Sequence, residues 1–311
     1  MPDSDVLIRA TGLTKRFGGF TAVDGIDFEL RHGEAFGFLG PNGAGKSSTM
    51  RMIGCVSPPT SGTLTILGLD SVAQGQAIRG RLGVVPQEDT LDIDLTVREN
   101  LLVYGRYFGL PRAVIAERTT RLLEFVQLAD RAGDQVDALS GGMKRRLTIA
   151  RSLINEPEIL LLDEPTTGLD PQARHVVWDR LFRLKQQGVT LVLTTHYMDE
   201  AEQLCDRLVV MDGGRIAAGG SPRELIDQYA TPEVLELRFQ PSDHDQAAEK
   251  LADFPAERIE VLADRLLLYV ADGDAALAAA RGRGVEPLTS LVRRSTLEDV
   301  FLRLTGRRLE D

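Results

Sequence analysis

Apolar residues recur along this chain with two different spacings, and the alternation of the two predicts an α/β fold. Short unbroken apolar runs end near Leu39, Asp163 and His196, and such runs are typical of strands buried on both faces of a parallel sheet. Between them, apolar residues recur every three or four positions, which indicates helices with one buried face. Strands that alternate with helices predict a mostly parallel sheet covered by helices.

One long segment departs from this alternation. From Thr96 to about Gln127 the apolar spacing is helical throughout, interrupted at Gly109 and Pro111. We therefore expect a helical subdomain at about residues 88–150, inserted into the α/β domain. Its aromatic side chains would either pack in a core or line a groove for a partner helix.

The pattern changes again near Thr231, where we expect a boundary between a first domain at residues 1–230 and a second at residues 231–311. The elements expected in the second domain are strand 233–239, helix 244–252, strands 258–262 and 265–271, helix 274–282, a strand near 287–292 and helix 296–304. This order predicts a small ferredoxin-like α+β domain. It carries no chemical motif, so a regulatory role and a role in packing alone are equally open.

The glycine-rich stretch FGFLGPNGAGKSSTMRM, at residues 36–52, joins a strand end to a helix. Its glycines would let successive backbone N–H groups surround a polyphosphate. Lys46 would reach the β and γ phosphates and Ser47 would place its hydroxyl on Mg²⁺, while the helix presents its positive N-terminus. The stretch therefore predicts a loop that binds a nucleoside triphosphate. The expected contacts are Gly40, Pro41, Asn42, Gly43, Ala44, Gly45, Lys46, Ser47 and Ser48.

Two carboxylates, Asp163 and Glu164, stand at the carboxyl end of the apolar run ILLL. Adjacent carboxylates there are costly unless they serve a cation or a proton transfer. Beside a phosphate-binding loop, Asp163 fits a ligand of Mg²⁺ acting through water, and Glu164 fits a base that polarises an attacking water. His196 ends another buried strand and is expected at the same edge, although such a histidine could also be an ordinary satisfied polar residue.

Two weaker signals concern further contacts with a nucleotide. Within LSGGM, at residues 139–143, Ser140 is placed to cap the following helix, and its free N–H groups would form a second anion site. Near the glycine turn at residues 18–19, Phe17 either belongs to the core or offers a stacking platform for an adenine ring.

Composition limits the classes of function. The chain has 311 residues, is 43% apolar and carries a formal charge of −10, which argues against nonspecific binding of nucleic acid. Its two cysteines, Cys55 and Cys205, lack metal-ligand spacing and fit a reducing cytosol. The N-terminus does not read as a signal peptide, and no apolar run approaches the length of a membrane span. We therefore expect any membrane role to pass through a partner chain.

Taken together, these motifs resemble the ATP-binding cassette family over residues 6 to about 225. The phosphate loop, Gln87, LSGGM, ILLLDE at residues 159–164, GLD at 168–170 and His196 stand in the family's order. The resemblance implies that two chains pair head to tail, so that Ser140, Gly141 and Gly142 of one chain close over the γ-phosphate of an ATP bound by the other. Each ATP would then join two copies of the chain.

By position, the resemblance implies further roles. Phe17 would stack on adenine, Gln87 would sense the γ-phosphate beside Mg²⁺ and link the site to a membrane subunit, and Asp170 would join the nucleotide contacts. Glu164 would be the catalytic base and His196 the γ-phosphate switch, with Lys46 completing the catalytic set. The family more often has Tyr in place of Phe17, Gln in place of Met143 and Thr in place of Ser48. Since none of these departures removes a needed donor, hydrolysis is expected to survive them.

The runs GVVPQEDTLDIDLTVREN, GGMKRRL and STLEDVFLRLTGR are similar to the ATPases of ABC-2 type exporters, in the nodulation and daunorubicin-resistance branches. This implies a peripheral subunit at the cytoplasmic face of the membrane, working as a dimer on a separate ABC-2 permease that exports a drug, lipid or saccharide. The alternative is a soluble cassette ATPase acting on ribosomes or DNA, but no second cassette or long coiled-coil insertion is present. A switch module that binds ATP without turnover is disfavoured by Glu164 and His196.

Overall fold

The computed structural model describes residues 5–306, whose contacts divide them into two compact units. The first unit ends at Ser221 and the second begins at Pro222. The division thus falls before helix α8 (Pro222–Tyr229), whereas the sequence pattern places it after this helix. Helix α8 lies with the second unit because it packs against α11 (Leu297–Thr305), a contact between residues far apart in the sequence.

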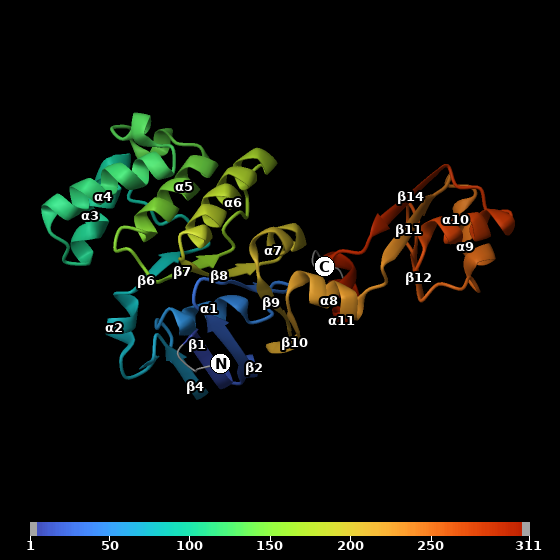
Figure 1. Ribbon diagram of the computed structural model, residues 1–311, viewed down its shortest axis with the longest axis horizontal. Coiled ribbons are helices and arrows are strands. Elements are labelled where there is room, and N and C mark those ends of the chain that lie inside the picture. Colours follow the sequence, from blue (N-terminus) through green and yellow to red (C-terminus); the bar gives the residue numbers. More distant parts are fainter. Residues whose placement is uncertain (1–4, 307–311) are drawn as a thin grey trace. The chain divides into compact units, whose positions relative to one another are not determined.

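Two sheets form the framework of the first unit (Figure 1). The antiparallel sheet has the order β2-β1-β4-β5, and the second sheet has the order β10-β9-β3-β8-β7-β6 and is parallel except at β10. Their strands are β1 (Val6–Phe17), β2 (Phe20–Arg31), β3 (Ala35–Leu39), β4 (Ser61–Ile66), β5 (Leu69–Asp70), β6 (Leu82–Val85), β7 (Ile159–Asp163), β8 (Thr190–Thr195), β9 (Arg207–Asp212) and β10 (Arg215–Gly220). The parallel pairing confirms the expected α/β class.

The two sheets share one apolar core, and helix α1 (Lys46–Ile53) lies within it. Phe28 of β2 and Phe36 and Phe38 of β3 have ring centroids 5.2 to 6.2 Å apart, so their edges and faces interlock. Helix α1 contacts β2 on one side and β7 and β8 on the other. This burial fixes the start of α1 at the carboxyl edge of the parallel sheet, where β3, β7 and β8 also end.

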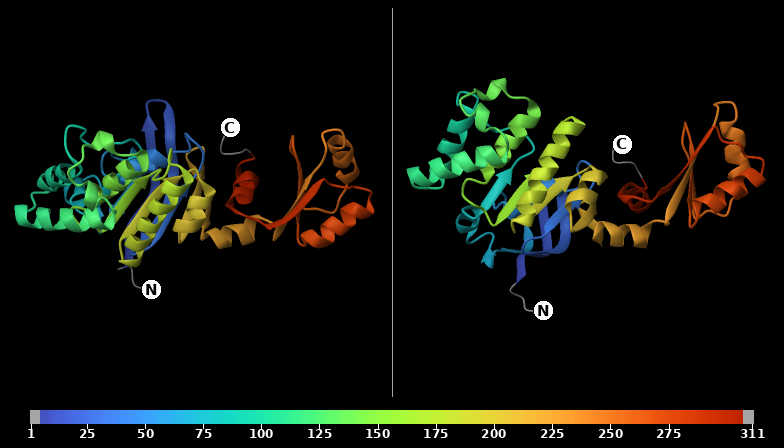
Figure 2. Two further views of the ribbon diagram at one scale, coloured as in Figure 1. Left: turned by 90° about the horizontal axis from the view of Figure 1, so that it is seen from above. Right: turned by 45° about the horizontal axis from the view of Figure 1, so that its top comes forward.

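The remaining helices of the first unit include the expected helical insertion, drawn in blue-green to green (Figures 1 and 2). They are α2 (Gly75–Arg79), α3 (Val97–Tyr107), α4 (Arg112–Phe125), α5 (Gly141–Ser152), α6 (Pro171–Gln186) and α7 (Met198–Leu204). Thr96 and Glu99 form a capping box that begins α3. Among the aromatic side chains at the end of α3, Tyr107 is 79% exposed, while the half-buried Tyr104 packs edge-on against Tyr107 and Phe108. Helix α5 contacts α3, α4, α6 and β6, and so joins the helical insertion to the sheet.

The second unit is the α+β fold predicted from its apolar spacing. Its antiparallel sheet has the order β12-β13-β11-β14, which places the first and third strands of the unit at the centre. The elements are β11 (Glu233–Arg238), α9 (His244–Leu251), β12 (Arg258–Val261), β13 (Leu266–Val270), α10 (Gly273–Gly282), β14 (Thr289–Arg294) and α11. Leucines of β11 and β13 pack with α9 and α10 in one core on one face of the sheet (Figure 2).

Neither cysteine is set up as a reactive thiol. Cys205 is buried and Cys55 is half-buried, and burial raises the pKa of both. Among residues 5–306, no helix is long and apolar enough to span a bilayer.

Candidate functional site

The loop between β3 and α1 has a backbone that only glycine accommodates at several points. Gly43 and Gly45 have φ angles of 81° and 102°, in the left-handed region that other residues rarely adopt. A Cβ atom on Gly45 would lie 2.4 Å from the Ala22 carbonyl oxygen, and one on Gly40 would lie 2.4 Å from that of Met211. The N-terminus of α1 has no side-chain cap and no acidic residue in its first turn, so its N–H groups are available to an anion.

Lys46, the first residue of α1, is 4% exposed and lies at the centre of the site. Its Nζ atom donates to the carbonyl oxygens of Gly40, at 2.7 Å, and Pro41, at 3.0 Å. The same atom lies 3.9 Å from Oε1 of Glu164. Burial lowers the pKa of Lys46, while the charges of Glu164 and Asp163 act against that shift. The ammonium group is thus held between the loop and the two carboxylates.

Asp163 and Ser47 form the part of the site that could hold a metal ion. Ser47 Oγ donates to Asp163 Oδ1 at 3.4 Å, and the Thr194 hydroxyl, from the neighbouring strand β8, donates to the same oxygen. Within the described part of the chain, no cluster of three or more His, Cys, Asp or Glu residues could bind a metal on its own. One carboxylate and one hydroxyl match the habit of Mg²⁺, which keeps water and substrate phosphates as its other ligands.

Glu164 follows the end of β7 and is 6% exposed. Its backbone has a φ of 46° and its N–H donates to the hydroxyl of Thr194 at 3.0 Å. Its Oε2 accepts hydrogen bonds of 3.0 Å from Gln87 Nε2 and from the Thr167 hydroxyl. Nδ1 of His196 lies 3.2 Å from the other oxygen, Oε1.

The pKa of Glu164 is lowered by this environment. The close approach of His196 is the largest cause, burial acts in the opposite direction, and Lys46 and Thr167 add to the lowering. A carboxylate held ionised, with both oxygens oriented by neighbours, is suited to accept a proton. The structure therefore brings together the predicted residues Lys46, Ser47, Gln87, Asp163, Glu164 and His196.

Gln87 reaches Glu164 from a loop that begins at the end of β6. It borders a cavity of about 320 Å³ that lies between α1 and the ends of β6 and β7. Ser47 and Asp163 line the same cavity, together with apolar side chains that include Met50 and Val84.

The other residues predicted to contact the nucleotide, Ser140, Asp170 and Phe17, are not among the residues that surround Lys46 and Glu164. Ser140 is the N-cap of α5 and accepts from the N–H of Met143 at 3.3 Å, so its predicted capping role is present. Asp170 caps α6 through the N–H of Ala173. Phe17, the last residue of β1, is 52% exposed and is not part of the core. The Nζ atom of Lys15 lies 5.1 Å from its ring centroid.

Two buried charged residues next to the site were not predicted. Arg145 of α5 and Glu200 of α7 are 9% and 0% exposed. Glu200 accepts hydrogen bonds from the Thr166 hydroxyl at 2.7 Å and from Trp178 Nε1 at 3.0 Å. The sequence shows Arg145 only as the middle of the basic triplet KRR, with no sign that it is buried.

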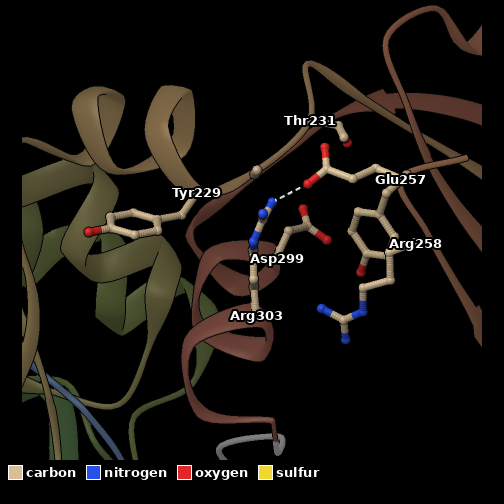
Figure 3. A pocket seen from close by; sticks show the side chains of 8 residues that line it. Tyr229, Thr231, Glu257, Arg258, Asp299 and Arg303 are labelled. Atoms are coloured by element: carbon tan, nitrogen blue, oxygen red, sulfur yellow. Dashed lines mark hydrogen bonds and ion pairs between the residues drawn. The ribbon is translucent and has the colours of Figure 1, made fainter.

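A second cavity, of about 230 Å³, lies within the second unit (Figure 3). Two of its charged side chains, Arg303 and Glu257, form an ion pair of 2.5 Å, and a third, Asp299, accepts two hydrogen bonds from Arg293. Asp299 is 2% exposed. These charged side chains therefore already have partners within the second unit.

Comparison with known proteins gives consistent matches in both units. Residues 23–167 match the family described as ABC transporter, and residues 245–306 match the Nodulation factor export protein NodI, C-terminal domain. The chain is 49% identical to the Nod factor export ATP-binding protein I of Ralstonia nicotianae, covering 99% of this chain and 96% of that protein. It is 48% identical to the protein of the same name in Cupriavidus metallidurans, covering 98% and 99% of the two chains.

Solved structures resemble the first unit. An ATP-binding cassette of an ABC transporter in its ADP conformation is similar with a TM-score of 0.66 and 26% identity, covering 72% of this chain and 94% of that one. The dimeric post-hydrolysis state of another cassette, bound to ADP and Pi, is similar with a TM-score of 0.63 and 27% identity, covering 69% and 98%.

Proposed function

This chain belongs to the ATP-binding cassette transporter family and is the ATPase subunit of an exporter, and we propose that it works as a homodimer on an ABC-2 type permease. The relatives are named as export ATP-binding proteins, and a similar cassette is a dimer. We place the dimer at the cytoplasmic face of the membrane, held there by the permease. The cargo would be a drug, lipid or saccharide, and the Nod factor in the relatives' names is the first compound to test.

The observation that carries the proposed site is the placement of Glu164 beside Lys46 and Asp163. The loop N–H groups and Lys46 would bind the phosphates of ATP. Asp163 and Ser47 would hold Mg²⁺, which supplies positive charge that neutralises the transferring phosphoryl group. Gln87 would contribute to the same metal site and register the γ-phosphate.

Hydrolysis then follows from the position of the carboxylate. Glu164 would take a proton from water as the water oxygen bonds to the γ-phosphorus, and the bond from that phosphorus to the bridging oxygen of ADP would break. Lys46 would stabilise the negative charge on the phosphoryl oxygens. His196 would hold Glu164 ionised and contact the γ-phosphate.

The contacts of Ser140, Gly141 and Gly142 would come from the second copy of the chain. Ser140 and the N–H groups of Gly141 and Gly142 are exposed or half-exposed at the start of α5, where they can meet a phosphate from outside their own chain. Phe17 would stack on the adenine ring, and Asp170 would lie beside the same nucleotide. A soluble role on ribosomes or DNA receives no support from these relatives.

The test is hydrolysis of Mg-ATP by the purified chain. Lys46→Ala should nearly abolish the release of phosphate, because it removes the cation that faces the developing charge. Lys250→Ala is the matched control, since Lys250 is exposed on α9 and donates only to the Gly284 carbonyl oxygen among the described contacts. Equal activity in both variants would refute the assignment of the site.

A further inference from the structure

Arg145 links the helix that begins with Ser140 to the backbone that carries Glu164. It lies in the second turn of α5, and its guanidinium group reaches the segment that follows β7. Nε donates to the carbonyl oxygen of Pro165 at 2.7 Å, and Nη2 donates to those of Asp163 at 3.0 Å and Glu164 at 3.1 Å. One side chain thus holds three consecutive peptide units at the catalytic carboxylate.

The other terminal nitrogen of Arg145 holds the segment that carries Gln87. Nη1 donates to the carbonyl oxygen of Pro86 and lies 3.5 Å from that of Gln87. Because the Gln87 side chain donates to Glu164, Arg145 fixes the backbone at both ends of that hydrogen bond. An arginine has five N–H donors in a rigid planar fork, so this geometry cannot be reproduced by a flexible ammonium group.

Burial of the charged guanidinium group of Arg145 is electrostatically unfavourable. Burial lowers the pKa of Arg145 to about 10, and the carboxylate of Glu200 is the strongest influence against that shift. The group therefore stays charged near neutral pH. Its hydrogen bonds in the described structure go to backbone carbonyl oxygens, so the charge is placed to hold the chain and not to pair with a carboxylate.

We propose that Arg145 is a positioning residue that couples Ser140 to Glu164 and Gln87. This rests on the proposed function, in which Ser140 contacts the ATP bound by the other chain. Ser140 and Arg145 are five residues apart, which is roughly 7.5 Å of rigid helix. A shift of the helix start when Ser140 meets a phosphate is carried by the guanidinium group to the backbone of Glu164. The base of one site thereby responds to the nucleotide of the other.

The experiment compares Arg145→Lys with Arg146→Lys in ATP hydrolysis and in equilibrium binding of a fluorescent ATP analogue. Arg146 is the matched control, since it is the adjacent arginine and donates to the Val126 carbonyl oxygen, away from the site. Arg145→Lys should lower kcat by roughly tenfold to a hundredfold, the order expected when a catalytic group is misplaced by about 1 Å. KM and binding of the analogue should change by less than about twofold. Arg146→Lys should leave all three near the parent values.

Coupling is tested by adding Ser140→Ala. If Arg145 transmits the contact of Ser140, the effects of the two substitutions on ln kcat should be clearly less than additive, whereas a purely structural role gives additive effects. Arg145→Gln, which also removes the buried charge, is the second variant for both readouts. Failure of both Arg145 variants to fold would assign the residue a structural role and overturn the proposal.

Glu164→Gln in the same assay separates the two proposals. If Glu164→Gln loses activity while Arg145→Lys keeps the parent kcat, or if the double-mutant effects add, the coupling is wrong and the proposed function stands. If Glu164→Gln hydrolyses ATP at the parent rate, the base assignment fails and the coupling fails with it.

Discussion

Replacement of Glu164 by Gln should separate ATP binding from hydrolysis. The amide has nearly the shape of the carboxylate but cannot accept a proton from water. With its oxygen in the place of Oε2, it still accepts from Gln87 and Thr167, as the carboxylate does. Its NH₂ group then faces Lys46 and His196, which lie 3.9 and 3.2 Å from Oε1.

The magnitudes follow from this geometry. In Glu164→Gln the amide NH₂ group faces the Lys46 ammonium group, and this should cost about 1 to 3 kcal/mol of folding stability, the range for a buried polar group that loses its partner. Loss of a general base should slow hydrolysis by about 10² to 10⁴, which corresponds to about 3 to 5 kcal/mol in the activation free energy. The catalytic loss should therefore exceed the loss of stability.

Because ATP would still bind, the Glu164→Gln chain should remain closed as a dimer around two nucleotides. Size-exclusion chromatography with saturating Mg-ATP should show a dimer for this variant and a monomer when Ser140→Arg is added, since that bulky side chain blocks the opposite phosphate. Gly142→Asp, which adds like charge, is a second blocking change. Glu249→Gln, exposed on α9, is the control for the amide substitution.

Two results would refute this reasoning. Hydrolysis at the parent rate would show that Glu164 is not the base. A monomer at saturating ATP, with hydrolysis lost, would show that the isolated chain does not close around nucleotide and needs the permease.

Three other predictions concern pH, the ion pair of Asp299 and the division of the chain. His196→Ala removes the largest cause that lowers the pKa of Glu164, so the acidic limb of kcat/KM for ATP hydrolysis should move to higher pH; an unchanged profile would contradict the role of His196. Burial raises the pKa of Asp299, but hydrogen bonds from Arg293 and from the Thr296 N–H outweigh this effect, so the pKa is lowered overall. The stability that Asp299 contributes is therefore present above its unfolded pKa of about 3.9 and is lost as the pH falls through its folded pKa. Asp299→Asn should therefore cost about 3 kcal/mol near pH 7 and less in acid, measured by urea unfolding at several pH values, and an equal cost at all pH values would count against the ion pair. A chain that ends at Ser221 should fold and bind ATP, because the site residues precede that point; loss of ATP binding would mean that the two units depend on each other.

The parts of the site that lie next to one another in the sequence could be predicted, and the parts that depend on packing could not. The loop at residues 40–45 and the pair Asp163–Glu164 were recognisable because their residue types and spacing are themselves the chemical signal. Arg145 could not be recognised, since its partners are backbone carbonyl oxygens, which every residue type has. Glu200 was missed because the Thr166 and Trp178 contacts come from distant segments.

The same distinction holds for the fold. The order of strands and helices followed from apolar periodicity, which is local, and the second unit matched the expected order element by element. The contacts divide the units before α8, whereas the apolar pattern places the boundary after it, because the contact of α8 with α11 joins residues about seventy positions apart. The pairing of Arg293 with Asp299 could not be predicted from the sequence either, since it depends on where β14 ends relative to the start of α11.

The left-handed backbone of Glu164 lowers the stability of the fold at the residue that is proposed as the base in ATP hydrolysis. A non-glycine residue with a φ of 46° carries a conformational cost on the order of 1 kcal/mol or more, and glycine or asparagine would adopt this angle more easily. The backbone alone would therefore favour another residue type at this position, whereas the partners Lys46, Gln87 and His196 and the proposed catalytic role favour the carboxylate. Replacing Glu164 by asparagine would relieve the backbone strain but would leave these partners without a carboxylate, so the two effects act in opposite directions on the stability of the fold.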